Sequence, residues 1–292
     1  MKTHIIRNVS ILVCIGFAAA PSVTTAAIIA DDFFAYTAGT ALTTGGAGNG
    51  GTGFSAAWSG ATTNNRSYTG ATGTFSTPTN YSVGVDATYA ALTAGTSSLS
   101  FSRTLSSSIN FNSTGTYYFS ALVSMLNNGT SSGDVFFPRF LDASSTNVVS
   151  FGMNSSNAIK ITTGSSTTSS TTLSEGASFD TATQYLIIGK MVLSDTGNDQ
   201  FFYSLIPASS SVSLTEPASW SVSATANLSV TATQVAFSVN ANGGTLNVDN
   251  FILASDYASV VSAVPEVSTS ALLAGFACFA CGLARRRFRH RG

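Results

Sequence analysis

The sequence predicts an all-β protein, an antiparallel β-sandwich with an N-terminal signal helix before it and a single C-terminal transmembrane helix after it. The 292-residue chain is rich in Ser, Thr, Gly, Asn and aromatic residues, and only 9% of it is charged; this composition suits strands and turns. Apolar and polar residues alternate with a period of two, as in residues 234–240, where Val235, Phe237 and Val239 share one face. Because no amphipathic helix pattern competes with this alternation, two packed sheets are the predicted architecture.

The first 27 residues have the layout of a secretory signal. Lys2 and Arg7 precede an apolar run at residues 11–20, and small residues follow it. This order of basic, apolar and small residues is typical of a cleavable export signal. We expect cleavage after Ala26 or Ala27, and an uncleaved anchor helix is the alternative.

The predicted sandwich occupies residues 28–262. Its strands are expected where alternation is clearest, at residues 30–36, 99–105, 117–125, 135–142, 148–153, 158–162, 184–193, 200–205, 234–240 and 245–254. Gly-containing and Asn-containing turns separate several of them, as at residues 127–129, 196–198 and 242–244. One helical turn is expected at residues 256–261, with Asp256 as its cap. Residues 43–52 and 162–172 are expected to be exposed loops because they are almost wholly Gly, Ala, Ser and Thr.

The predicted domain is acidic, although the whole chain is nearly neutral. Residues 28–264 carry five basic and twelve acidic side chains, a formal net charge of −7, against −1 for the whole chain. An acidic surface repels phosphate backbones, so we expect no nucleic-acid partner.

The predicted domain also lacks cysteine and histidine. The cysteines are Cys14, Cys278 and Cys281, and the histidines are His4 and His290. Disulfides, Ser-His-Asp triads, Cys-His pairs and histidine-ligated zinc are therefore excluded for residues 28–262. Carboxylate chemistry, oxygen-ligated calcium and a role without chemistry remain.

A calcium site is conceivable at one short acidic loop. Asp195, Asn198 and Asp199 surround Gly197, and calcium prefers such oxygen ligands. The loop is shorter than the twelve-residue EF-hand loop, and the same residues favour a hairpin turn. We favour the turn, and calcium is the one cofactor that the sequence leaves open.

Two further features could serve carbohydrate chemistry. The only glutamates of the domain, Glu175 and Glu216, could in principle form the carboxylate pair of a glycosidase, but no strand cluster of acidic residues supports this. Trp58, with Phe54 and Tyr68, could stack on a sugar ring; the favoured alternative is that Trp58 and Phe54 anchor a glycine-rich loop to the core. Trp220 has the same ambiguity.

The last 30 residues combine a short polar element, an apolar run and a basic cluster. Val264, Pro265, Glu266, Ser268 and Thr269 precede the apolar residues 271–284, which end at Arg285, Arg286 and Arg287. Cys278 and Cys281 lie inside the apolar run, so we read them as small apolar residues and not as a redox pair. The run is about long enough to span a membrane, with the arginines remaining cytoplasmic.

This three-part pattern resembles the PEP-CTERM sorting signal of Gram-negative bacteria. The chain departs from that pattern at Val267, where the family usually has a second proline. The resemblance implies transient anchoring of residues 263–292 in the inner membrane, processing near Pro265 and Glu266 by an exosortase, and delivery to the cell surface or an exopolysaccharide matrix.

The predicted domain resembles the jelly-roll, concanavalin/laminin-G-like domains that often precede this signal. The similar stretches are DDFFAYTAGTAL, GGTGFSAAW, LIIGKMVLSDTGNDQFFYSLIP and LNVDNFILASDYASVV. Many such domains bind sugars or calcium, but the resemblance places no site on particular residues. We therefore expect a non-catalytic surface or matrix protein that binds extracellular polysaccharide or acts as an adhesin. The alternative is a secreted, carboxylate-dependent glycosidase or polysaccharide lyase.

Overall fold

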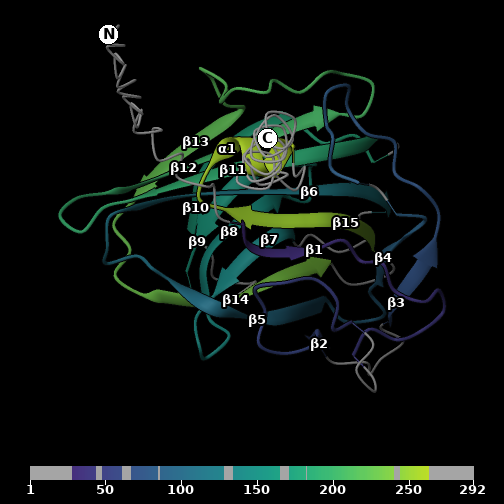
Figure 1. Cartoon of the computed structure of the whole chain (residues 1–292). Helices are drawn as coiled ribbons and strands as arrows, with labels where there is room; N and C mark the ends of the chain where they lie inside the picture. Colours follow the sequence, from purple (N-terminus) through teal and green to yellow (C-terminus); the bar gives the residue numbers. More distant parts are fainter. Residues whose placement is uncertain are drawn as a thin grey trace, which may run out of the picture.

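The described part of the chain forms two antiparallel β-sheets packed face to face (Figure 1). The computed structural model describes residues 28–43, 48–60, 67–84, 86–127, 134–164, 171–181, 183–239 and 244–262. The predicted signal helix and C-terminal transmembrane helix lie outside these ranges. Within them, no helix has the length and apolar character needed to cross a membrane.

Sheet I has eight strands. Seven of them follow one another as β13 (Val222–Ala226), β12 (Asp199–Pro207), β11 (Gln184–Leu193), β6 (Gly115–Asn127), β15 (Thr245–Ala254), β4 (Thr88–Thr93) and β3 (Ser67–Thr72). The first half of β15 pairs with β4, and its second half pairs with β1 (Ile28–Asp32). The N-terminal strand is thereby fixed beside the last strand of the domain.

Sheet II has seven strands. Their order is β10 (Thr171–Ser178), β9 (Ala158–Thr163), β8 (Asn147–Met153), β7 (Val135–Leu141), β14 (Thr231–Val239), β5 (Leu99–Asn110) and β2 (Ser59–Gly60). The chain crosses between the sheets at two places that lie side by side: β5 pairs with β14 in sheet II, and the strands that follow them, β6 and β15, pair in sheet I. Such paired crossings between two sheets are typical of jelly-roll connectivity.

The main core lies between the sheets, where the inward residues of each alternating strand meet. Phe119 of sheet I packs against Phe151 of sheet II with ring centroids 4.7 Å apart. A second, smaller cluster covers the opposite face of sheet I, where helix α1 (Tyr257–Val261) packs against β6 and β15. Asp256 caps this helix by accepting a hydrogen bond from the Ser259 amide at 3.0 Å, which confirms the predicted cap.

The predicted strands are confirmed except at some of their ends. The first prediction, residues 30–36, is wrong beyond Asp32 because Phe34 has a φ of 50° and its amide bonds the Asp32 carboxylate, which turns the chain out of the sheet. β2, β3, β4, β10 and β13 were not predicted. They lie at or near the sheet edges and are short or lack strict alternation.

The two predicted exposed loops are corrected in part. Within residues 43–52, Thr52 exchanges backbone hydrogen bonds with Asp31, and Gly48 is buried. Within residues 162–172, Thr162 is fully buried in β9, and Thr171 begins β10. Both segments contribute backbone pairing, which a Ser-rich or Gly-rich composition does not reveal.

Candidate functional site

The acidic loop proposed for calcium is the connection of a β-hairpin. β11 and β12 pair antiparallel up to Val192 and Gln200, so the hairpin interpretation is confirmed. Asp199 is fully buried, and its two carboxylate oxygens accept hydrogen bonds from the amides of Ser194 and Leu228 at 3.0 Å. Asp195 and Asn198 are exposed, and Asp195 accepts a hydrogen bond from Thr114. The carboxylate of Asp199 thus accepts hydrogen bonds from the backbone of the hairpin and of the segment after β13.

The aromatic residues of the glycine-rich segment belong to the core. Trp58 and Tyr68 are 2% and 1% exposed, and Trp58 stacks on Phe101 with a centroid distance of 4.1 Å. Its indole Nε1 donates to Asp32 Oδ2 at 2.7 Å. The interpretation that Trp58 or Tyr68 stacks on a sugar is therefore wrong. The alternative interpretation, that Trp58 anchors the glycine-rich segment to the core, is confirmed.

The remaining sequence-predicted residues lie in several places. Glu175 is in β10, opposite Lys160 of β9. Glu216 lies against the outer face of sheet I, in the segment that joins β12 to β13. The sorting-signal residues Val264, Pro265, Glu266, Ser268, Thr269, Arg285, Arg286 and Arg287 lie outside the described residues.

The outer face of sheet I carries a row of side chains from four neighbouring strands. The strand register places Tyr118 of β6 beside Lys190 of β11, Lys190 beside Phe202 of β12, and Phe202 beside Ser223 of β13. Lys190 Nζ lies 5.5 Å from the ring centre of Tyr118 and 5.6 Å from that of Phe202. Inward neighbours such as Phe201 and Tyr203 pack in the core, so the pleat fixes the outward direction of this row.

Glu216 joins two members of the row. Its carboxylate lies 2.5 Å from Lys190 Nζ and accepts a hydrogen bond from the Tyr118 hydroxyl at 2.6 Å. Partial burial opposes ionisation of Glu216, but these two hydrogen bonds together lower its pKa. Burial and the bond to Glu216 raise the pKa of Tyr118, so its hydroxyl keeps its proton. A protonated tyrosine and a paired lysine are poor general bases.

Trp220 extends the row over Phe202. The two rings lie 5.8 Å apart at 41°, and both are half-buried. The Ser221 amide donates to Ser204 Oγ at 3.0 Å, which holds the segment carrying Trp220 against β12. We call Phe202, Trp220, Lys190 and Glu216 the aromatic platform.

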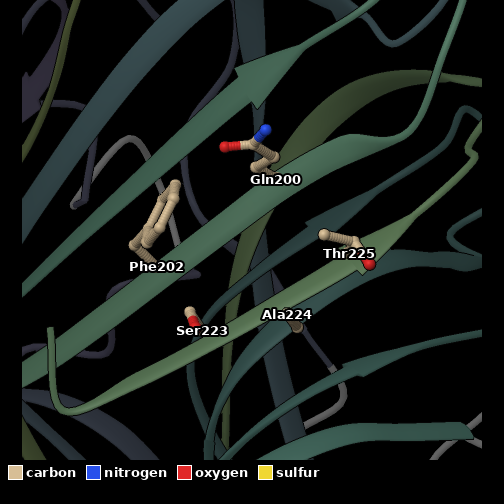
Figure 2. A pocket seen from close by; sticks show the side chains of 5 residues that line it. All are labelled: Gln200, Phe202, Ser223, Ala224 and Thr225. Carbon is tan, nitrogen blue, oxygen red and sulfur yellow. The ribbon is translucent and has the colours of Figure 1, made fainter.

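A shallow hollow of about 390 Å³ adjoins the platform at the edge of the sheet. Figure 2 shows Gln200 and Phe202 on β12 and Ser223, Ala224 and Thr225 on β13, the residues that line it. Gln200, Ser223 and Thr225 are exposed and carry amide or hydroxyl groups. At this place a half-buried aromatic ring lies beside neutral hydrogen-bond donors and acceptors.

Sequence reasoning singled out Trp220 and Glu216 but missed their neighbours. The stretch Gln200–Leu205 alternates, and because Phe201 and Tyr203 are obvious core residues, Phe202 between them had to face outward. The pairing of Phe202 with Lys190 and Trp220 depends on strand register, which alternation does not reveal. Among the described residues, no group of three or more His, Cys, Asp or Glu side chains could hold a metal ion.

The fold and this surface define a two-sheet antiparallel sandwich with an aromatic platform on one outer face. No protein-family model matches the chain, and no curated protein sequence matches it. Several solved structures are similar at low identity. The globular domain of T. cruzi calreticulin shares 12% identity over 65% of this chain and 85% of that chain, with a TM-score of 0.38.

Two other similar structures have comparable scores. The carbohydrate-binding module CBM66 from Bacillus subtilis shares 11% identity over 63% of this chain and 92% of that chain, with a TM-score of 0.37. An alginate lyase from Corynebacterium sp. shares 12% identity over 65% and 77% of the two chains, with a TM-score of 0.39. Matches to two botulinum neurotoxin binding domains span 44% of those longer chains. The assignment of the β-sandwich rests on the strand pairing itself.

Proposed function

We propose that this protein is an exported, non-catalytic carbohydrate-binding module of the cell surface or extracellular matrix. The observation that carries the proposal is the Phe202–Trp220 pair, which is half-buried beside the hollow lined by Gln200, Ser223 and Thr225. A sugar ring has an apolar C–H face and a rim of hydroxyl groups. It therefore suits an aromatic surface bordered by neutral hydrogen-bonding side chains.

The charges of the platform support binding without catalysis. Lys190 and Glu216 neutralise each other at 2.5 Å, and Tyr118 satisfies the second oxygen of Glu216 at 2.6 Å. A glycosidase needs a second carboxyl group across the scissile bond. Among the described residues, the other domain glutamate lies in β10 of the opposite sheet, and Asp256, whose charge acts on Tyr118, caps helix α1 by accepting a hydrogen bond from the Ser259 amide. Two platform residues, Lys190 and Phe202, are fixed by strand register, and the segment that carries Glu216 and Trp220 is held to them by the bonds of Glu216 and of the Ser221 amide.

Export and sorting form the second part of the proposal and rest on the sequence. The signal-like residues 1–27 and the PEP-CTERM-like residues 263–292 support passage through the inner membrane, processing by an exosortase and display on a Gram-negative cell. Extracellular polysaccharide is the ligand available in that compartment. We include no cofactor in this proposal.

Binding of the full chain to an array of neutral and acidic glycans tests the proposal. We expect specific binding that falls about tenfold or more in Trp220→Ala and Phe202→Ala, because each loses a stacking surface. Leu214→Ala is the matched control, since Leu214 is an apolar side chain of the same segment, is 56% exposed and lies outside the platform. Unchanged binding in both platform variants, or release of new reducing ends from a bound glycan, would contradict the proposal.

A further inference from the structure

Lys190 borders the aromatic ring that lines the hollow. In the strand register Phe202 lies between Lys190 of β11 and Ser223 of β13, and Phe202 and Ser223 both belong to the lining (Figure 2). Lys190 Nζ lies 5.6 Å from the centre of the Phe202 ring, and the Lys190 side chain is 18% exposed. A sugar seated on Phe202 would therefore carry its substituents close to this ammonium group.

Glu216 occupies the position at Lys190 that an anionic substituent of a sugar would need. Its Oε1 lies 2.5 Å from Lys190 Nζ, and its Oε2 accepts a hydrogen bond from the Tyr118 hydroxyl at 2.6 Å. Although partial burial opposes ionisation, these bonds lower the pKa of Glu216 overall, so its carboxylate is charged at neutral pH. Because the Glu216 side chain is 34% exposed, a carboxylate or sulfate that approaches Lys190 meets a like charge.

The rest of the described surface also gives an acidic glycan little attraction. Within the described ranges every basic side chain other than Lys190 is buried; these are Arg103, Arg139 and Lys160. Exposed acidic side chains remain at Asp86, Asp180 and Asp195. The lining of the hollow is uncharged, since it consists of an aromatic ring, a methyl group, an amide and hydroxyl groups. The repulsion at Glu216 therefore adds to a general repulsion of polyanions.

We propose that the aromatic platform selects neutral glycans, and that Glu216 determines this specificity by keeping Lys190 from binding uronate carboxylates or sulfate esters. A neutral sugar needs only the apolar ring and the hydrogen-bonding groups of Gln200, Ser223 and Thr225. An acidic sugar at the same place brings its charge against that of Glu216, and such a repulsive contact discriminates between ligands of otherwise similar shape. This inference rests on the proposed carbohydrate-binding function and names the class of glycan.

Pairs of glycans that differ in charge test the inference. The polymer pairs are dextran and dextran sulfate, methyl-esterified and de-esterified polygalacturonate, and hydroxyethylcellulose and carboxymethylcellulose; array glycans that differ only by a carboxylate or sulfate form further pairs. The full chain is titrated with both members, and the ratio of the acidic to the neutral affinity is measured. We expect a ratio below one in every pair that binds, and a neutral affinity that changes little with ionic strength. A ratio of one or more in any bound pair would overturn the inference.

Glu216→Gln should raise this ratio about tenfold, because it removes the repelling charge and leaves the Lys190 ammonium to an incoming anion. The gain should vanish at high ionic strength, and the double variant Glu216→Gln/Lys190→Gln should lack it because the cation is gone. Asp195→Asn is the matched control, since it removes an exposed carboxylate outside the platform and should leave the ratio unchanged. An unchanged ratio in Glu216→Gln, or an equal rise in Asp195→Asn, means that Glu216 does not determine the specificity.

Lys190→Gln provides a second measurement that does not disturb the carboxylate. Glu216 helps to hold the segment that carries Trp220, so Glu216→Gln could lose affinity for both members of a pair. In that case Lys190→Gln decides the inference, because it keeps the Glu216 carboxylate and its bond with Tyr118 while removing the cation. The ratio should then fall further below that of the parent. A ratio that stays the same or rises would overturn the inference.

Trp220→Ala distinguishes this inference from the proposed function. Neutral-glycan binding that falls in Trp220→Ala, together with a ratio that rises in Glu216→Gln, supports both. The same fall in Trp220→Ala with an unchanged ratio in Glu216→Gln overturns the role of Glu216 and leaves the platform as a binding site. Absence of binding to every polymer and every array glycan overturns both.

Discussion

Arg103 of β5 and Asp32 of β1 form an ion pair in the interior of the sandwich, with Nη1 2.6 Å from Oδ2 and side chains 2% and 1% exposed. Asp32 also accepts hydrogen bonds from Trp58 Nε1, the Tyr36 hydroxyl and the Phe34 amide. Arg103 donates further hydrogen bonds to the carbonyl oxygens of Gly50 and Ala56. The pair thereby joins the first strand to sheet II and holds the glycine-rich segment between them.

Asp32→Ala should destabilise the protein by about 3–5 kcal/mol, because it leaves the Arg103 guanidinium buried without a counter-ion. Urea denaturation followed by tryptophan fluorescence measures the free energy of unfolding. Asp195→Ala is the control, since Asp195 is exposed and bonds only Thr114 among the described residues; we expect a change within about 0.5 kcal/mol. Equal stability of the two variants would mean that the ion pair does not hold the fold together.

The same region shows what the sequence could and could not predict. Alternation in residues 234–240 and 245–254 was enough to place β14 and β15, because it depends only on local pattern. Asp31 and Asp32 read as the start of a longer strand, and nothing local revealed that Asp32 would meet Arg103, 71 residues away. The strand assignment of Asp32 is correct, but the sequence does not reveal the buried network to which its side chain belongs.

The outer faces show the same limit. The sequence marks Trp220 as ambiguous and Glu216 as a possible glycosidase carboxylate, but their partners Lys190 and Phe202 lie on two neighbouring strands and meet only through the strand register. Arg139 sits in VFFPRFL, which reads as a core strand, and only the sheet order places small residues on both sides of it. Composition thus predicted the fold class, whereas the sites depend on pairings distant in the chain.

Asp249 should make the protein less stable as pH rises from 4 to 8. Burial raises the pKa of its carboxyl from 3.8 to about 8, and the nearby Asp86 and Asp32 carboxylates act in the same direction. In that range the unfolded chain has released the proton that the folded protein retains, so the free energy of unfolding falls by at most about 1.4 kcal/mol per pH unit from this group.

Asp249→Asn tests this relationship, because an amide of the same shape cannot titrate. The variant should gain stability over the parent at pH 8 and lose that advantage at pH 4, as measured by urea denaturation at both pH values. Carboxylates that do not interact with Asp249 contribute equally to both proteins, so the difference between them reports Asp249 together with its coupling to Asp86 and Asp32. Parallel pH profiles would show that Asp249 keeps an ordinary pKa in the fold.

Gly189→Ala should destabilise the sandwich by about 1–3 kcal/mol. Gly189 of β11 lies opposite Phe119 of β6, and a Cβ atom there would overlap the phenyl ring. That ring also packs against Phe140 and Phe151 of sheet II, so it has no free space to move into. Gly84→Ala is the control, since its added Cβ would meet no atom within 4 Å. Similar melting temperatures for the two variants would contradict this packing argument.

Replacement of Arg285, Arg286 and Arg287 by Gln should impair processing of the C-terminal segment. These arginines follow the apolar residues 271–284, and positive charge after an apolar run favours retention on the cytoplasmic side. Without it, the segment has no strong orientation in the inner membrane, and the exosortase that we propose as partner would meet its recognition sequence less often.

Intact-mass measurement of surface protein should show that the parent ends near Glu266 and that the triple variant accumulates unprocessed. Arg66→Gln, a loss of charge in the predicted domain, is the control and should leave processing unchanged. Detection of His290 on surface protein from the parent strain would contradict the sorting proposal.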